Sequence, residues 1–203
     1  MCNHPLAFPV TECVVFRGKA DLFPHGAYVI IHGTLREETA MEFYRTIHDG
    51  AAARPGLCRA LGISVKLLPG LVYAAYPLML LYLLLFRQEF LLRSILVPAA
   101  GFLIATVLRA GINAPRPYEV LGIPPRTPKE TKGKSFPSRH AACAAVIAVT
   151  ALKVLPPLGA VLCGIALLIS VSRVLAGVHF VRDVVCGLLL GGLIGWIGMY
   201  LVP

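Results

Sequence analysis

The feature that most constrains this chain is a series of apolar runs, each close to the length needed to cross a bilayer. The first covers residues 67–86 and the second residues 90–108. Two shorter runs follow, at residues 140–155 and 158–171, and a fifth run covers residues 184–202. Because a transmembrane helix needs about 20 mostly apolar residues, the pattern predicts an all-α integral membrane bundle of about five helices.

The charges are distributed unevenly along the chain. The 203 residues are 57% hydrophobic and 14% charged, whereas a soluble domain carries about 25% charged residues. Residues 1–60 hold six basic and six acidic side chains, so the net charge of +9 lies entirely in residues 61–203. An apolar segment with this charge indicates a membrane and an anionic ligand. Nucleic acid is excluded as a partner, because the cations stand between apolar runs rather than on a polar face.

The same division predicts the domain organisation. Residues 1–60 are expected to form an N-terminal extension, with an interfacial helix over residues 41–60 that is broken near Pro55. Residues 61–203 are expected to form the membrane-embedded domain. Because that domain would stand without the first forty residues, Met41 is a candidate first residue of the natural protein.

Three clusters of polar residues interrupt the apolar chain, at residues 109–117, 136–140 and 172–183. The first cluster follows the second span, the second precedes the third span, and the third joins the last two spans. Counting helices therefore places all three clusters on one side of the membrane. Charged residues near the membrane core are costly and usually functional, so the clusters predict a single site.

The side chains in these clusters suit phosphoryl transfer. Arginine forks match the oxygens of a phosphate, and a serine at a helix start adds a hydroxyl beside free backbone N–H groups. A carboxylate on one ring nitrogen of a histidine leaves the other nitrogen as a nucleophile, and a second histidine can protonate the leaving group. The residues concerned are Arg109, Arg116, Arg173, Ser138, His179, Asp183 and His140. This chemistry requires no metal and no other cofactor.

The order and spacing of the clusters resemble the three-part signature of the type 2 phosphatidic acid phosphatase superfamily. That signature reads Lys-x6-Arg-Pro, then Pro-Ser-Gly-His, then Ser-Arg-x5-His-x3-Asp. The corresponding segments here begin at Arg109, Pro137 and Ser172, and the resemblance covers about residues 65–203. The family includes lipid phosphate phosphatases and undecaprenyl-diphosphate phosphatases.

The resemblance implies a metal-independent phosphatase that acts on a lipid phosphate or diphosphate through a phosphohistidine. It assigns phosphate binding to Arg109, Arg116, Ser138 and Arg173, the general acid to His140, the phosphorylated nucleophile to His179, and the orienting carboxylate to Asp183. Two residues depart from the pattern. Arg109 replaces a lysine and keeps its charge, and Arg139 replaces the glycine before His140. The additional cation at Arg139 is expected to bind substrate phosphate, and it favours a diphosphate such as a prenyl diphosphate.

Other functions remain open at this point. The same chemistry would serve a phosphatidic acid or phosphatidylglycerophosphate phosphatase, and the arginines alone would serve a non-enzymatic carrier of lipid phosphates. A metal site can also be drawn from His140, Cys143, Asp183 and Cys186, although it leaves the arginines unused. A simpler interpretation is that both cysteines are small residues that pack between helices.

The remaining polar residues have simpler readings. Lys129, Lys132 and Lys134 are expected to form a rim that attracts lipid headgroups, and the role of Arg182 is left open. A stripe of small residues, Gly187, Gly191 and Gly195, follows Asp183 at four-residue steps and predicts close helix packing.

The expected localisation is the bacterial cytoplasmic membrane, with the site on the extracytoplasmic side. Related enzymes commonly open to that side, which would place the C-terminus in the cytoplasm. A count of positive charges gives the opposite orientation, but cations that bind phosphate do not report topology.

Overall fold

The structure is a computed structural model that describes residues 42, 45, 46, 50, 54–120, 122 and 131–201. The chain divides into two compact units, Met1–Thr46 and Ile47–Pro203, and the second unit contains every element discussed below. Nine of the twenty residues of the expected interfacial helix over residues 41–60 lie outside the described residues, and so do the candidate start at Met41 and the rim residue Lys129.

The described residues of the second unit form five long helices. They are α2 (Pro55–Phe86), α3 (Leu91–Ile112), α5 (Arg139–Val154), α6 (Pro156–Leu175) and α7 (Val181–Trp196). Three short elements accompany them: η2 (Gln88–Phe90), α4 (Pro117–Val120) and η3 (Ile197–Leu201). In the described part of the chain, four helical stretches are long and apolar enough to cross a membrane, and the predicted all-α membrane bundle is confirmed.

Local sequence explains where these helices begin and end. The predicted break near Pro55 is the start of α2, since proline is favoured in a first helical turn. From there α2 continues for 32 residues, past the expected division at residue 60. Pro156 cannot continue α5, because it has no backbone N–H, and it opens α6 instead. At the end of α3, Asn113 takes a left-handed conformation with φ of 46°, as residues that terminate a helix often do.

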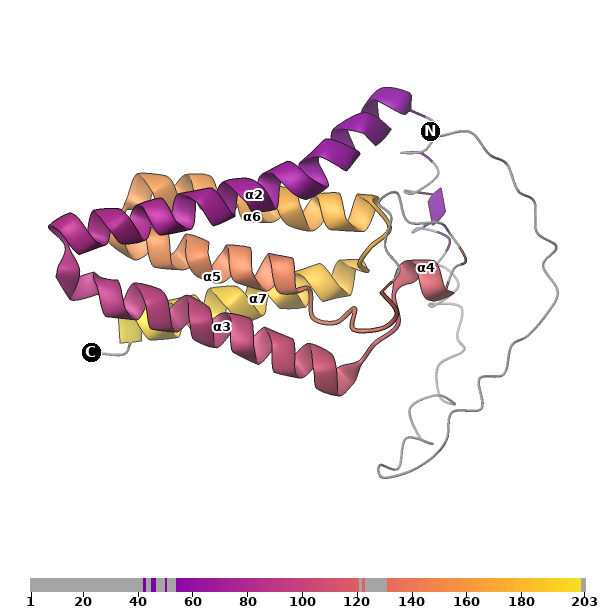
Figure 1. Cartoon of the computed structure of the whole chain (residues 1–203). Helices are drawn as coiled ribbons and strands as arrows, with labels where there is room; N and C mark the ends of the chain where they lie inside the picture. The colour runs from indigo at the N-terminus through magenta and orange to yellow at the C-terminus, as the bar shows by residue number, and fades with distance from the viewer. Residues whose placement is uncertain are drawn as a thin grey trace. The chain divides into compact units, whose positions relative to one another are not determined.

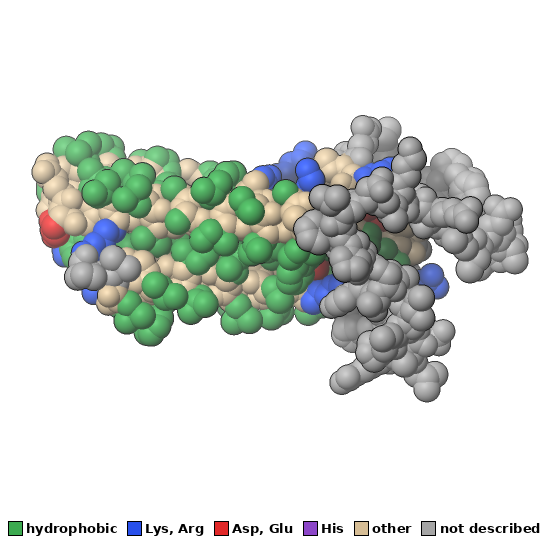
Figure 2. Space-filling view, turned by 90° about the horizontal axis from the view of Figure 1, so that it is seen from below, with side chains coloured by type: hydrophobic (Ala, Val, Ile, Leu, Met, Phe, Trp, Pro, Cys, Tyr) green, Lys and Arg blue, Asp and Glu red, His purple; other side chains and the backbone are tan. Residues whose placement is uncertain are grey.

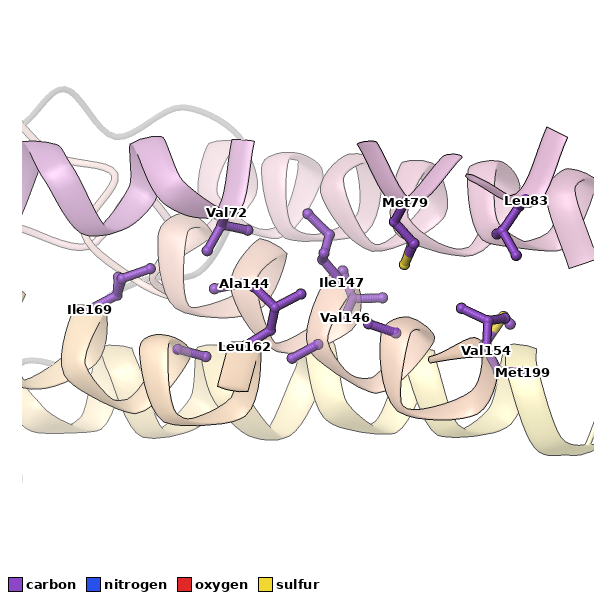
Figure 3. Packing of buried hydrophobic residues seen from close by; sticks show 13 residues of the cluster. Val72, Met79, Leu83, Ala144, Val146, Ile147, Val154, Leu162, Ile169 and Met199 are labelled. Carbon is purple, nitrogen blue, oxygen red and sulfur yellow. The ribbon is translucent and has the colours of Figure 1, made fainter. Parts of the chain in front are cut away.

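The helix α5, with sixteen residues, lies at the centre of the bundle (Figure 1). It contacts α2, α3, α6 and α7, and ten of its sixteen residues are buried. Its Val146 and Ile147 belong to a core cluster that includes Met79 of α2 and Leu162 of α6 (Figure 3). The central helix therefore fixes the positions of the helices around it.

The outer surface of the helices is apolar. Figure 2 shows hydrophobic side chains along the length of the bundle, with Lys and Arg side chains gathered towards its ends. Large side chains such as Leu78, Leu85 and Leu189 are about two-thirds exposed. A soluble protein rarely leaves so extensive an apolar surface in water, and here the surface matches the hydrocarbon of a bilayer.

The glycine stripe of α7 packs against α5, as predicted from the four-residue steps. All three glycines are buried. A Cβ at Gly187 would lie 2.6 Å from the carbonyl oxygen of Ser138, and a Cβ at Gly191 would collide with the carbonyl oxygen of Ala142. The absence of side chains at these positions lets the start of α7 approach the start of α5.

Candidate active site

The three polar clusters meet at one end of the bundle. The end of α3, the start of α5, the end of α6 and the start of α7 all lie at the right-hand end in Figure 1, beside α4. The convergence expected from the order of the helices is therefore present in the structure.

A cavity of about 550 Å³ opens at this end. Its lining consists of Thr106, Arg109, Ala110, Arg116, Thr131, Lys132, Gly133, Lys134, Arg139, His140 and His179. Five of these described residues are Lys or Arg and none is Asp or Glu. Cations gathered in a hollow with apolar walls concentrate anions, so the cavity is suited to a phosphorylated ligand.

Arg116 is the buried arginine of this lining, with 4% of its surface exposed. Its Nε donates a hydrogen bond to the carbonyl oxygen of Gly133 at 2.9 Å. Its Nη1 is buried and has no hydrogen-bond partner among the described residues. Buried polar groups are almost always paired, so this free N–H group is available for a phosphate oxygen.

Arg109 and Arg139 approach the cavity from different helices. Arg109, in the last turn of α3, donates from Nη1 to the carbonyl oxygen of Pro137 at 3.4 Å. Arg139 is the first residue of α5, and its guanidinium lies 5.5 Å from the ring centroid of Phe102 on α3. The two arginines thus join the end of α3 to the start of α5 while lining the cavity.

Ser138 is the residue immediately before α5. Its backbone N–H donates to the carbonyl oxygen of Asp183 at 2.8 Å, which ties α5 to α7. Its hydroxyl makes no capping bond, and the buried Oγ has no partner among the described residues. Because α5 begins at Arg139, Ser138 lies at the helix start, as expected.

His179 and Asp183 form a buried pair. The distance from His179 Nδ1 to Asp183 Oδ2 is 3.5 Å, and 1% or less of each side chain is exposed. The two residues do not share a helical face, because α7 begins at Val181, after His179. Asp183 lies in the first turn of α7, where its Oδ2 also accepts the N–H of Phe180 at 3.1 Å.

The loop that carries His179 is held by the end of α6. The carbonyl oxygen of Arg173 accepts the N–H groups of Val178 and His179 at 3.1 and 3.3 Å, and Gly177 adopts a φ of 74° that favours glycine. Burial lowers the pKa of His179 to about 4, although Asp183 acts in the opposite direction. His179 is therefore neutral near pH 7, which is the form that a nucleophile requires.

Arg173, Ser138 and Asp183 are buried and are not part of the cavity lining. The guanidinium of Arg173 donates from Nη2 to the carbonyl oxygen of Val65, on α2, at 3.2 Å. Its Nε has no partner among the described residues. Arg173 thus connects α2 to α6, and one of its N–H groups remains free.

Two residues that the sequence analysis did not select contact the predicted ones. The hydroxyl of Ser135 donates to Asp183 Oδ2 at 2.5 Å. The carboxylate of Glu119 accepts the N–H of Arg116 at 2.7 Å and the N–H of Gly133 at 2.9 Å. Ser135 stands one residue before the second polar cluster, and a wider window around that cluster would have included it.

The remaining cations fall into two groups. Lys132 and Lys134 are exposed and line the cavity, which agrees with the expected rim. Arg182 has 66% of its side chain exposed, with Nε 3.6 Å from Asp183 Oδ1 and the guanidinium 5.2 Å from the ring centroid of Phe180. Its observed contacts are therefore with residues of the same turn.

The residues of the alternative metal site do not form a ligand set. Among the described residues, no group of three or more His, Cys, Asp or Glu side chains lies close enough together to hold a metal ion. Cys143 and Cys186 are free thiols of intermediate exposure.

Comparison with known proteins places this arrangement in a family. The family model of the PAP2 superfamily matches residues 72–203. The crystal structure of Aquifex aeolicus LpxE is 31% identical with a TM-score of 0.64, covering 78% of this chain and 93% of that one. The crystal structure of a transmembrane PAP2-type phosphatidylglycerolphosphate phosphatase from Bacillus subtilis is 26% identical with a TM-score of 0.65, covering 83% and 86%. No curated protein matches the chain. By its family match, its membrane fold and its three motifs, the chain belongs to the PAP2 superfamily, whose members are phosphatases.

Proposed function

We propose that this protein hydrolyses a lipid phosphate or diphosphate through a phosphohistidine formed on His179. The observation that carries the proposal is the cationic cavity with a neutral, buried His179 in its wall and Asp183 behind it. The similarity to a phosphatidylglycerolphosphate phosphatase supports a lipid as the carrier of the phosphate.

The first step is an in-line displacement at phosphorus. With Nδ1–H directed towards Asp183, the lone pair on His179 Nε2 attacks the terminal phosphate, and the bond from phosphorus to the leaving oxygen breaks. Arg109 and Arg116 stabilise the charge on the remaining phosphate oxygens. His140, which lines the same cavity, donates its proton to the leaving oxygen.

The second step releases inorganic phosphate. A water molecule attacks the phosphorus of the phosphohistidine, and the phosphorus–nitrogen bond breaks. His140, now deprotonated, accepts a proton from that water, so both histidines return to their starting states. The scheme uses only side chains of this chain and needs no metal.

A diphosphate, such as a prenyl diphosphate, is the preferred substrate. Arg139 supports this preference, because it adds a cation to the lining next to His140. In a diphosphate the leaving group is itself a phosphate, and its charge favours a neighbouring cation. A phosphatidylglycerophosphate or phosphatidic acid substrate would use the same two steps, and the Bacillus subtilis relative supports the former as the alternative.

A membrane with the site on its extracytoplasmic face is the proposed setting. The tendency of related enzymes supports this orientation.

Replacement of His179 by Ala tests the proposed chemistry. We expect His179→Ala to abolish phosphate release from micellar lipid diphosphate and to abolish acid-labile labelling by a ³²P-labelled substrate. The control is Ser170→Ala, which removes a buried hydroxyl whose partner, within the described part of the chain, is the Ala166 carbonyl oxygen of the same helix at 2.9 Å. Substantial phosphate release by the His179 variant would refute the scheme. Substrate binding by the wild type without phosphate release would favour a non-enzymatic carrier.

A further inference from the structure

Ser135 is a buried hydroxyl residue beside the proposed nucleophile. Its exposed surface is 0%. Its Oγ lies 2.5 Å from Asp183 Oδ2 and 3.4 Å from His179 Nδ1. It is not part of the cavity lining, so it contacts the proposed nucleophile and its carboxylate partner without facing the substrate.

Asp183 depends on few partners for a buried carboxylate. Its Oδ2 accepts the Ser135 hydroxyl and the Phe180 N–H. Its Oδ1 has no hydrogen-bond partner among the described residues, and the nearest cation is the Nε of Arg182 at 3.6 Å. An ionised carboxylate away from water is costly unless it is hydrogen-bonded. Ser135 therefore supplies the side-chain donor that fixes one carboxylate oxygen next to the imidazole.

The backbone around Ser135 is fixed to the segment that carries a phosphate-binding arginine. The N–H of Ser135 donates to the carbonyl oxygen of Ala114 at 2.9 Å. Two residues earlier, Gly133 is bonded to Glu119 through its N–H and to Arg116 through its carbonyl oxygen. Hydrogen bonds to the segment of Arg116 thus fix the backbone of Ser135, while its hydroxyl contacts His179 and Asp183.

We infer that Ser135 is a positioning residue for phosphoryl transfer: it orients the Asp183 carboxylate so that His179 keeps its proton on Nδ1 and presents Nε2 to the substrate. This inference rests on the proposed phosphohistidine chemistry. Loss of the hydroxyl would leave Oδ2 with the backbone N–H of Phe180 and the imidazole of His179. The carboxylate would then be less firmly held and could turn away from the ring. The effect falls on the rate of the chemical step rather than on substrate binding.

The test compares Ser135→Ala with wild type and with Ser170→Ala in detergent micelles. We expect Ser135→Ala to lower kcat about tenfold or more, in line with the loss of a hydrogen bond to a buried charge. KM and the inhibition constant of inorganic phosphate should stay within about twofold, because Ser135 does not line the cavity. Ser135→Thr, which restores a hydroxyl, should recover most of kcat, and Ser170→Ala should match wild type.

Two results would overturn the inference. One is a kcat for Ser135→Ala equal to that of wild type. The other is a rise in the phosphate inhibition constant as large as the fall in kcat, which would make Ser135 a binding residue. If the alanine variant does not fold, the Ser135→Cys variant replaces it in the test, since a thiol is similar in size to a hydroxyl and a weaker hydrogen-bond donor. A lowered kcat of Ser135→Cys supports the inference. An unchanged kcat overturns it. Failure of the proposed function would appear differently, as a wild-type protein that forms no phosphoenzyme.

Discussion

Single residues in this protein separate into those that face the cavity and those that hold the facing residues in place. Arg109, Arg116 and His179 belong to the first group, and their sequence motifs identified them. Ser135 belongs to the second, and its partners lie 44 and 48 positions away along the chain. A sequence motif shows residues that lie close together along the chain. A contact between distant segments depends on how the helices pack, and no motif shows it. The sequence motifs therefore identified residues that line the cavity, and they missed Ser135.

Arg139 provides the prediction for substrate choice. Arg139 lines the same cavity as His140, the residue proposed to protonate the leaving group. We expect Arg139→Gly to raise KM for a lipid diphosphate about tenfold, and to raise KM for the matching monophosphate much less, because only the former has a charged leaving group. Steady-state kinetics on both lipids measures the difference. The control is Lys153→Gln, which removes a cation from the last turn of α5. Equal changes for the two lipids would remove the argument for a diphosphate.

The sequence predicted the number of long helices, but it placed the ends of some of them at the wrong residues. The apolar runs identified all five long helices, but α2 begins at Pro55 rather than near residue 67. Arg59 and Lys66 lie within that helix, and their charge concealed it from a search for apolar runs. The start of α7 at Val181 has a greater effect on function. It leaves His179 in a loop, where its orientation depends on the backbone hydrogen bonds that Val178 and His179 donate to the carbonyl oxygen of Arg173.

The contact between α5 and α7 provides a prediction at this scale. An added Cβ at Gly187 would lie 2.6 Å from the Ser138 carbonyl oxygen and 3.1 Å from Ala141 Cβ, and backbone atoms cannot yield cheaply at such distances. We expect Gly187→Ala to destabilise the folded state by about 1–3 kcal/mol, as overpacking usually does. It should also lower kcat, because it displaces Ser138, the residue immediately before α5. Thermal unfolding in detergent and kinetics would measure the two effects.

Gly192→Ala is the matched control for that experiment. Gly192 lies on the same helix, and a Cβ there would meet no atom within 4 Å. Since alanine favours helix over glycine, this variant should be at least as stable as wild type. Equal stability of the two variants would show that α5 and α7 are not closely packed at Gly187.

The molecule as a whole has an apolar exterior and a polar site at one end. The composition predicted the apolar exterior. With 57% hydrophobic residues, the chain has more apolar side chains than a core of this size can bury. Composition could not predict the orientation, because the charges that would report it also line the cavity. The structure places the turn between α2 and α3, and the end of η3, at the opposite end from the site (Figure 1).

Orientation gives the prediction at this scale. If the site faces the extracytoplasmic side, a fluorescent protein fused after the last residue should fluoresce, and an alkaline phosphatase fused there should be inactive. A second pair of fusions, placed after Gln88 in the turn between α2 and α3, should report the same side. Active alkaline phosphatase at both positions would reverse the orientation.

The length of α5 determines the depth at which a phosphate is received. Sixteen residues span about 24 Å at 1.5 Å per residue, roughly 6 Å less than the hydrocarbon thickness of a typical bilayer. At its far end, Lys153 lies 4.7 Å from the ring centroid of Tyr200, a combination typical of the membrane–water boundary. With that end at one boundary, the end beside Ser138 lies several ångströms beneath the other. A phosphate attached to a lipid is already close to that level, whereas a water-soluble phosphoester would have to sink below the headgroups to reach it. The short central helix thus favours substrates by the depth of their phosphate as well as by its charge.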